Sequence, residues 1–205
     1  MYIPSYNLED DPETLVAFMQ QHSFATLVSS LNSTLVATHI PIVTQMTGES
    51  ITLYSHVARA NPQWEAFGEA ESLVIFSGPH AYISPTLYEK RQSVPTWNYV
   101  AVHAYGTPRA FTFKNDREAT EAMMGLMMEA YEPAYREQWE SLSEKYRHGM
   151  MNGIVGFELP VTRLEGKYKL SQNRPVGDQE NVARALRDHA DPTVANVGKL
   201  MDEQR

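Results

Sequence analysis

The first half of the chain places short apolar or β-branched runs between turn-forming residues. Such runs favour strands because alternate side chains of a strand point to opposite faces. The turn-like pairs include Asn32-Ser33, and Gly48 lies in a second turn. Their close spacing indicates an antiparallel sheet or barrel rather than βαβ units. The predicted strands are residues 24–31, 35–43, 51–57, 73–77 and 97–105.

Helical patterns interrupt these strands at two points. Pro12, behind Asp10 and Asp11, suits the first position of a helix. The apolar face that follows has Leu15, Phe18, Met19 and His22 at helical spacing. Asn61 and Pro62 start a second, shorter helix. Further along the chain, Gly78-Pro79 is expected to end the predicted strand at 73–77.

The second half of the chain is richer in helix. Asn115 and Glu118 resemble a capping box, and the following apolar positions, including Met123 and Met127, predict a core-facing helix. Pro133 ends it, and a polar helix is expected over 134–148. A strand at 153–159 continues through 161–170. We expect one α+β domain over residues 1–205, with a helical C-terminal segment from about 178. From Asp191 the chain is expected to form a weakly packed helix or a frayed tail.

Composition narrows the classes of function. The 205 residues carry 17 Lys and Arg against 25 Asp and Glu, which gives a formal net charge of −8. A charge of this sign disfavours extensive binding to nucleic acid. The absence of cysteine excludes disulfides, thiolate metal sites and cysteine nucleophiles. No apolar run is long enough to span a bilayer, and residues 1–5 do not resemble a signal peptide. A cytoplasmic protein without membrane contact is the expectation.

A strand end beside a helix start makes the first candidate site. Arg59 lies between the strand at 51–57 and the helix start at Asn61. Free N–H groups of a helix N-terminus and a guanidinium suit a phosphate. Ser55 and His56 are further candidate donors to the same anion. The alternative is a surface arginine before an ordinary capped helix.

The run 94–106 has two different faces. Asn98, Val100, Val102 and Ala104 form an inward face by period two. Trp97, Tyr99, His103 and Tyr105 share the other face, which is too aromatic for plain solvent exposure. It needs a covering layer of the same subunit, a partner subunit or a flat ligand. The sequence leaves these alternatives open.

Local positive charge lies in residues 163–187. Lys169, Gln172 and Arg174 are dense in hydrogen-bond donors and suit an anionic or heteroaromatic ligand. The alternative is a charged, solvated strand edge. His39, His56, His80 and His103 lack helical zinc-site spacing, so no metal is predicted. No serine-hydrolase elbow, P-loop or GxGxxG motif occurs.

Several segments together resemble the PaiB-type family, described as FMN-binding negative transcriptional regulators. They lie in order between residues 1 and 175. Residues 176–205 add little to the resemblance. The matching segments are 1–4, 37–41, 56–64 (HVARANPQW), 78–85 (GPHAYISP), 94–99 (VPTWNY), 153–158 and 169–174 (KLSQNR).

The resemblance implies a split β-barrel similar to that of pyridoxamine phosphate oxidase, forming homodimers with FMN between the subunits. It places the ribityl phosphate at Arg59 and the helix start. The aromatic ring then lies beneath Trp97 and its neighbours, from the other subunit. The candidate FMN-binding residues are Thr38, His39, Ser55, His56, Ala58, Arg59, Asn61, Trp97, Asn98, Tyr99, Lys169, Gln172 and Arg174.

Two departures from the family pattern concern the phosphate. Asn152 stands near a position where a basic residue is expected, and Ala60 stands where the oxidases often have a second basic residue. Two functions follow. The first is a negative transcriptional regulator, in which the basic stretch 163–187 would be a small DNA-contacting face, although the net charge gives DNA binding little support. The alternative is an FMN-dependent oxidoreductase of unknown substrate, for which His103, Tyr82 and Tyr99 are conceivable proton donors and no catalytic residue is assigned.

Overall fold

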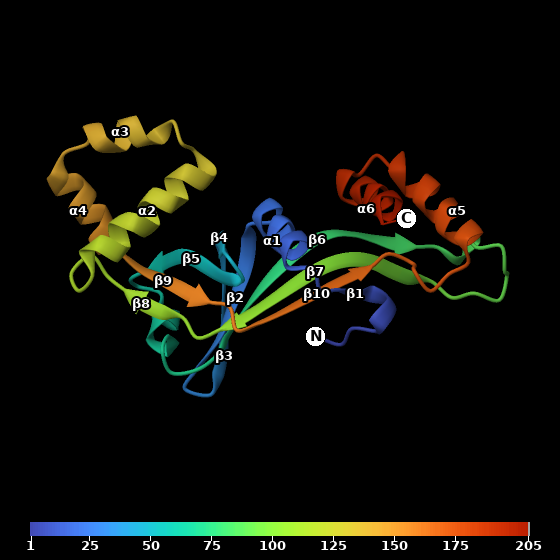
Figure 1. The fold of residues 1–205 in the computed structure, drawn as a ribbon, viewed down its shortest axis with the longest axis horizontal. Helices are drawn as coiled ribbons and strands as arrows, with labels where there is room; N and C mark the ends of the chain where they lie inside the picture. The colour runs from blue at the N-terminus through green and yellow to red at the C-terminus, as the bar shows by residue number, and fades with distance from the viewer. Residues whose placement is uncertain (205) are drawn as a thin grey trace. The chain divides into compact units, whose positions relative to one another are not determined.

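The computed structural model describes residues 1–204 as an α+β protein with antiparallel sheets (Figure 1). The chain divides into two compact units, each built from separate segments. Unit 1 comprises Met1–Leu15, Ser77–Val102 and the chain from Glu165 onward. Unit 2 comprises Val16–Phe76 and His103–Leu164. Each unit is described separately below.

Unit 2 contains two sets of strands. In the first, β2 (Phe24–Leu31) pairs with β3 (Thr34–Pro41) and with the start of β6 (Ser72–Ile83). The β2–β3 hairpin turns at Asn32 and Ser33, whose φ angles of 50° and 63° match the twist of a two-residue hairpin turn. The second set has the order β4-β5-β9-β8, with the bounds Val43–Thr47, Ser50–Ala58, Ile154–Pro160 and Arg109–Phe111.

The core of unit 2 follows the period-two pattern of its strands. Leu53 and Val57 of β5 point inward, as do Phe157 and Leu159 of β9. Phe157 is fully buried, and its ring meets the edge of the Phe67 ring at 5.1 Å between centroids. Aromatic pairs of this geometry add to the stabilisation from burial. These buried rows hold β5 and its C-terminal end in place.

Helices of unit 2 lie mainly between β8 and β9 in the sequence. They are α2 (Arg117–Tyr131), α3 (Tyr135–Ser141) and α4 (Glu144–Asn152). Asp116 caps α2 by accepting a hydrogen bond from the Ala119 N–H. Earlier in the chain, α1 spans Pro12–Gln21 and the 3₁₀ helix η2 spans Pro62–Ala66.

Unit 1 has the strand order β1-β10-β7-β6, with β1 at Leu8–Glu9, β7 at Thr96–Gly106 and β10 at Arg163–Lys169. Its helices are α5 (Val176–Arg187) and α6 (Pro192–Glu203), with 3₁₀ turns η1 (Ser5–Asn7) and η3 (Pro85–Leu87). Gly198 of α6 lies against α5: a Cβ there would be 3.0 Å from the Ala183 carbonyl oxygen. This glycine allows the two helices to approach closely.

The sequence located most elements correctly but misplaced several boundaries. The run 35–43 is two strands, because at Ile42 the chain passes from the ladder with β2 to the second set of strands, in which β4 pairs with β5. Residues 134–148 form two helices, because Ser143 caps α4. The capping residue of α2 is Asp116, since the Asn115 side chain is engaged with Thr112.

Three further expectations were wrong. β6 continues through Gly78-Pro79 to Ile83, since a proline φ is compatible with extended backbone. β9 does not continue into β10, because the N–H groups of Val161 and Thr162 turn to the carbonyls of Ile51 and Tyr105. The tail beyond Asp191 is a well-packed helix in which Val197 is fully buried. Among residues 1–204, no helix has both the length and the apolar character needed to cross a membrane.

Candidate functional site

Arg59 lies immediately after β5, in an exposed turn that other parts of unit 2 hold in place. Its backbone N–H donates to the Gly153 carbonyl at 2.9 Å. Its Nε donates to the Asn152 carbonyl at 2.6 Å, and its Nη2 donates to the Ile154 carbonyl at 3.2 Å. Two of the five guanidinium N–H groups are thus used to fix the side chain. The remaining donors fit a phosphate, for which the planar guanidinium is well suited.

A hydrogen-bond network supports this turn from below. Asn61 caps η2 by accepting from the Gln63 N–H at 3.0 Å, and it donates to the Thr38 hydroxyl at 2.9 Å. Thr38 donates in turn to the Gln63 side-chain oxygen at 2.5 Å. Gln63 is 1% exposed and also donates to the Leu27 carbonyl. The side chains of Thr38 and Asn61 therefore position the turn rather than offer free donors.

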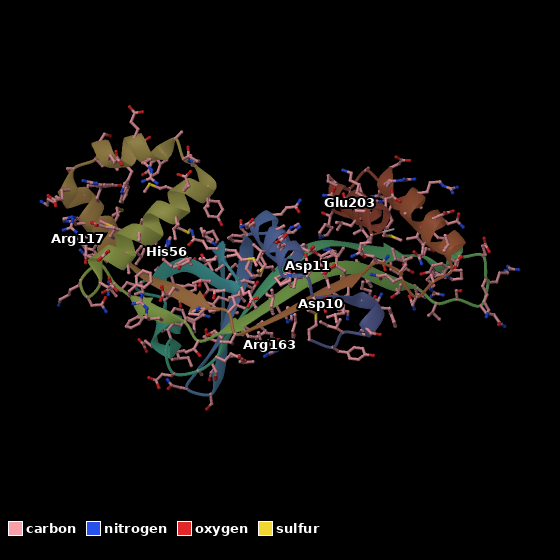
Figure 2. All side chains as sticks on the ribbon, viewed as in Figure 1. Asp10, Asp11, His56, Arg117, Arg163 and Glu203 are labelled. Carbon is pink, nitrogen blue, oxygen red and sulfur yellow. The ribbon has the colours of Figure 1, made fainter. Side chains whose placement is uncertain are left out.

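β5 sends its two polar candidates to opposite faces. Ser55 is fully buried, and its hydroxyl donates to the Pro41 carbonyl at 2.6 Å. The expectation that this hydroxyl donates to an anion is therefore not met. His56, labelled in Figure 2, belongs to β5. By the alternation along the strand it lies on the other face, which Tyr54 and Ala58 share. Its Nδ1 is buried and has no hydrogen-bond partner among the described residues.

Burial lowers the pKa of His56, because the charged imidazolium loses hydration there. The unfolded chain consequently binds more protons once the pH falls below about 6.5. We expect the free energy of unfolding to decrease from about pH 7 to about pH 5. In His56→Gln this decrease should be shallower, as measured by urea unfolding at each pH. Burial lowers the pKa of His22 in the same direction, so part of the pH dependence should persist. Equal slopes in both proteins would contradict the prediction.

His39 and Ala58 complete the candidates of unit 2. The His39 ring is exposed on β3, where its Nδ1 lies 2.9 Å from the Thr26 hydroxyl. It stacks beside the Phe24 ring at 6.4 Å. Ala58 ends β5 directly before Arg59 and is exposed. The exposure of His39 and Ala58 is compatible with a position of both residues beside a bound flavin.

Unit 1 presents an exposed aromatic cluster on β6 and β7. Trp97 is 53% exposed and Tyr82 52% exposed, with ring centroids 6.0 Å apart. His80 lies 6.1 Å from the Trp97 ring on another side. Flat aromatic surfaces left open to solvent suit a flat ligand or a protein partner. His80 and Tyr82 belong to the segment 78–85, which the sequence singled out without assigning it to this cluster.

Asn98 and Tyr99 lie on opposite faces of β7, as the period-two pattern requires. Asn98 is fully buried and donates to the Ser171 hydroxyl at 2.9 Å. Its placement over a flavin ring was therefore wrong, and its side chain instead fixes the segment that follows β10. The Tyr99 ring is half-buried and lies 5.2 Å from the Lys167 ammonium. A cation of β10 thus covers part of the aromatic face.

The three polar candidates after β10 are mostly committed within unit 1. Lys169 donates to the Thr96 hydroxyl at 2.7 Å and to the Trp97 carbonyl. Burial lowers its pKa, and the nearby charges of Lys167 and Arg174 act in the same direction. Gln172 bonds the backbone at Leu170 and Tyr168. The Arg174 guanidinium lies 4.1 Å from the Tyr88 ring centroid.

The structure thus brings the candidates into two groups, one in each unit. Arg59, His39 and Ala58 offer exposed surface in unit 2, while Trp97 offers it in unit 1. Sequence reasoning missed Gln63, the buried centre of the network under Arg59, because nothing local marks it. Asn152, which stands near a position where the family pattern has a basic residue, has a structural role. Its backbone carbonyl accepts a hydrogen bond from Arg59, and its side chain donates to the His148 carbonyl. In residues 1–204, no three His, Asp or Glu side chains are arranged to hold a metal ion.

Comparison with solved structures defines the fold class. The chain is similar to the flavocytochrome Anf3 from Azotobacter vinelandii, with a TM-score of 0.61 and 14% identity over 82% of this chain and 72% of that one. It is also similar to an FAD and heme binding protein from Mycobacterium smegmatis, with a TM-score of 0.58 and 15% identity over 87% and 80% of the two chains. At these identities the likeness concerns the fold, which is the expected split barrel.

Comparison with sequence families supplies the family. The family described as "Putative FMN-binding domain" matches residues 1–163, and the chain belongs to it. Its cofactor is accordingly FMN. Within this family the chain is 38% identical to "Protease synthase and sporulation protein PAI 2" of Bacillus subtilis, over 100% of this chain and 98% of the relative. The chain is thus an FMN-binding protein of the PaiB type, as the sequence motifs indicated.

Proposed function

We propose that this protein acts as a homodimeric, FMN-binding negative regulator of transcription in the cytoplasm. The observation that carries the proposal is the full-length similarity to the sporulation protein PAI 2, together with the family match over residues 1–163. FMN would be held through its phosphate by Arg59. The ring would be covered by the exposed aromatic cluster of the other subunit of the dimer, which Trp97 and Tyr82 form.

The chemistry of the two groups fits this cofactor. A phosphate needs charged donors, and Arg59 has guanidinium N–H groups beyond those bound to Asn152 and Ile154. An isoalloxazine ring needs flat apolar surface, which Trp97 supplies. When bound, FMN supplies one- or two-electron chemistry, while the chain orients it and limits water.

An exposed apolar face of unit 2 supports the dimer. Phe24 of β2 and Leu35 of β3 are 70% and 76% exposed, and their registers place both on one face. Phe24 pairs with Pro41, and Leu35 pairs with Ser30, so the two side chains mark opposite ends of this face. Covering such a patch with a second copy removes apolar area from water.

We expect the double variant Phe24→Lys with Leu35→Lys to shift the protein toward monomer, because two buried charges without partners oppose association. Light scattering after size exclusion measures the mass directly. The matched control is Tyr146→Lys, an exposed aromatic of α4 outside this face. A dimer that persists in the double variant at micromolar concentration would place the interface elsewhere.

The test of the regulatory function compares transcripts in four strains: wild type, a deletion, the deletion complemented with the wild-type gene, and the deletion complemented with Arg59→Ala. The proposal expects transcripts that rise on deletion and fall on complementation with the wild-type gene. An unchanged transcript profile on deletion would refute it. A gel shift with promoter DNA of the affected genes at low salt then separates direct from indirect action.

A flavin-dependent oxidoreductase is the second candidate function. It is favoured by the contacts that cations of the basic stretch 163–187 already make within the protein. Arg163 lies 3.4 Å from the Tyr105 ring and bonds Glu71, and Arg187 bonds Asp202 at 2.7 Å. Lys167 is buried and donates to the Tyr2 carbonyl. Cations committed in this way are less available for counterion exchange with DNA phosphates. Steady NAD(P)H consumption by the FMN-loaded protein would support this function, and its absence with varied acceptors would oppose it.

A further inference from the structure

The three helices between β8 and β9 line a cavity that lies wholly within unit 2 and is partly open to solvent. In Figure 1, the ribbons of α2, α3 and α4 follow one another as three sides of a triangle. The cavity has a volume of about 240 Å³ and is lined from all three helices. Met124 and Met128 come from α2, Trp139 from α3, and Arg147 and Met151 from α4. None of these residues belongs to the candidate FMN groups.

This cavity borders the hydrophobic core, because Met124 both lines the cavity and packs against the core cluster. Met123 and Met127 of α2 pack into the core cluster with Val43 and Phe111. Met128 projects from a different side of the same helix and lines the cavity. α2 therefore has two apolar sides, one serving the fold and one facing the cavity. Methionine and tryptophan together suit an aromatic or aliphatic group, because thioether sulfur contacts ring edges favourably.

Gly125 of α2 enlarges the cavity at the cost of helix stability. A glycine inside a helix costs about 1 kcal/mol relative to alanine. Gly125 lines the cavity, and a Cβ built there would meet no atom within 4 Å. No close packing accounts for the absence of a side chain. Gly149 of α4 has equally open surroundings but does not line this cavity, so the two glycines form a matched pair.

One N–H group of the cavity-lining Arg147 is left without an acceptor. The Nε of Arg147 is buried and has no hydrogen-bond partner among the described residues. A buried cationic donor of this kind costs free energy until an acceptor satisfies it.

The other charges at the cavity compete little for that acceptor. Glu121 is paired with Arg117 at 2.8 Å, and the Arg136 guanidinium lies 3.7 Å from Glu129. Glu140 is exposed, where water screens its repulsion of an anion. Arg147 is therefore the group that selects the ligand.

We propose that this cavity binds a small carboxylate with an apolar body, of the size of an aryl acetate. The carboxylate accepts a hydrogen bond from Arg147, and the apolar body lies among Met124, Met128, Met151 and Trp139. A cavity slightly below the usual range of roughly 300–1,000 Å³ suits a ligand of about ten non-hydrogen atoms. Such a site adds an effector or substrate site to the FMN-binding protein, and it does not depend on how FMN is held.

The test uses purified full-length protein labelled with ¹³C in the methionine methyl groups. Phenylacetate is the probe, and 2-phenylacetamide is its neutral counterpart of nearly equal shape. Titration with phenylacetate should shift the methyl signals of Met124, Met128 and Met151 saturably, while the core residue Met19 stays unchanged. The amide should bind about tenfold or more weakly, because it is neutral and cannot form an ion pair with the guanidinium. Single Met→Leu substitutions assign the signals.

Two pairs of proteins make the outcome decisive. Gly125→Leu should abolish binding by filling the cavity, whereas Gly149→Leu should retain it. Arg147→Gln should bind phenylacetate about as weakly as the wild type binds the amide, while binding of the amide changes little. The absence of saturable shifts, equal affinity for the two probes, or unchanged binding by Gly125→Leu would each overturn the proposal. Far-ultraviolet circular dichroism confirms that each variant remains helical.

Discussion

Arg59→Ala is expected to weaken FMN binding by about tenfold to a hundredfold. A charge-assisted hydrogen bond is worth about 1.5–3 kcal/mol, which corresponds to that range in the dissociation constant. The guanidinium is the charged donor at the turn after β5. The Ser55 hydroxyl is not available as a further donor, because it is buried and bound to the Pro41 carbonyl. Fluorescence quenching of added FMN by the apoprotein measures the change.

Riboflavin is the control ligand for this experiment, since it lacks only the phosphate. The ratio of FMN to riboflavin affinity should fall in Arg59→Ala, while riboflavin itself binds nearly as in the wild type. The Arg59 side chain also binds the carbonyls of Asn152 and Ile154, so its removal could disturb the local fold. A variant that lost its fold would lose the affinity for both ligands together. Arg184→Ala, an exposed arginine of α5, should change neither affinity. An unchanged ratio in Arg59→Ala would remove the phosphate role from this residue.

The sequence predicted the part of the candidate site that depends on local chain geometry. Arg59, Asn61 and Pro62 lie within a few residues of one another, so strand end, turn and cap can be recognised together. Period two also placed Asn98 inward, and the structure confirms this. The family resemblance, which placed Asn98 over the ring, was the weaker guide at that residue. Ser55 carried the same signal, since Leu53 and Val57 flank it on the inward face.

The parts that could not be predicted depend on contacts between distant segments. Gln63 is central only because Leu27 and Thr38 lie next to η2 in space. Similarly, Tyr82 meets Trp97 through the arrangement of β6 and β7. No local pattern contains such information, because strand order is set by the packing of the whole sheet.

Fold boundaries show the same division between local and distant causes. Strand β2 was predicted to the residue, since its apolar run ends at the Asn32-Ser33 turn. The break at Ile42 depends instead on the pairing of β4 with β5, a strand that comes later in the chain. The C-terminal tail was judged by its polar composition, although Val197 and Met201 are spaced as one helix face. Gly198 beside them permits the close approach to α5 that buries this face.

Gly156→Ala is expected to destabilise the protein by about 2–3 kcal/mol, lowering Tm by roughly 4–12 °C. Gly156 of β9 lies opposite His56 of β5 on one side and opposite Phe111 of β8 on the other. A Cβ there would be 2.3 Å from the Phe111 ring, which is itself 2% exposed and has no room to withdraw. Thermal unfolding followed by circular dichroism measures the loss.

A second substitution identifies the cause of this loss. Phe111→Leu removes the ring edge that collides with the new methyl group, so the double variant should be more stable than the sum of the two single effects predicts. Gly149→Ala is the matched control: a Cβ there meets nothing within 4 Å, and the change should be neutral or stabilising. Simple additivity in the double variant would show that the ring contact is not the source. Coupling between the two positions would show that the Phe111 ring of β8 packs directly on Gly156 of β9. Through this contact β8 helps to position β9, whose Ile154 carbonyl binds Arg59.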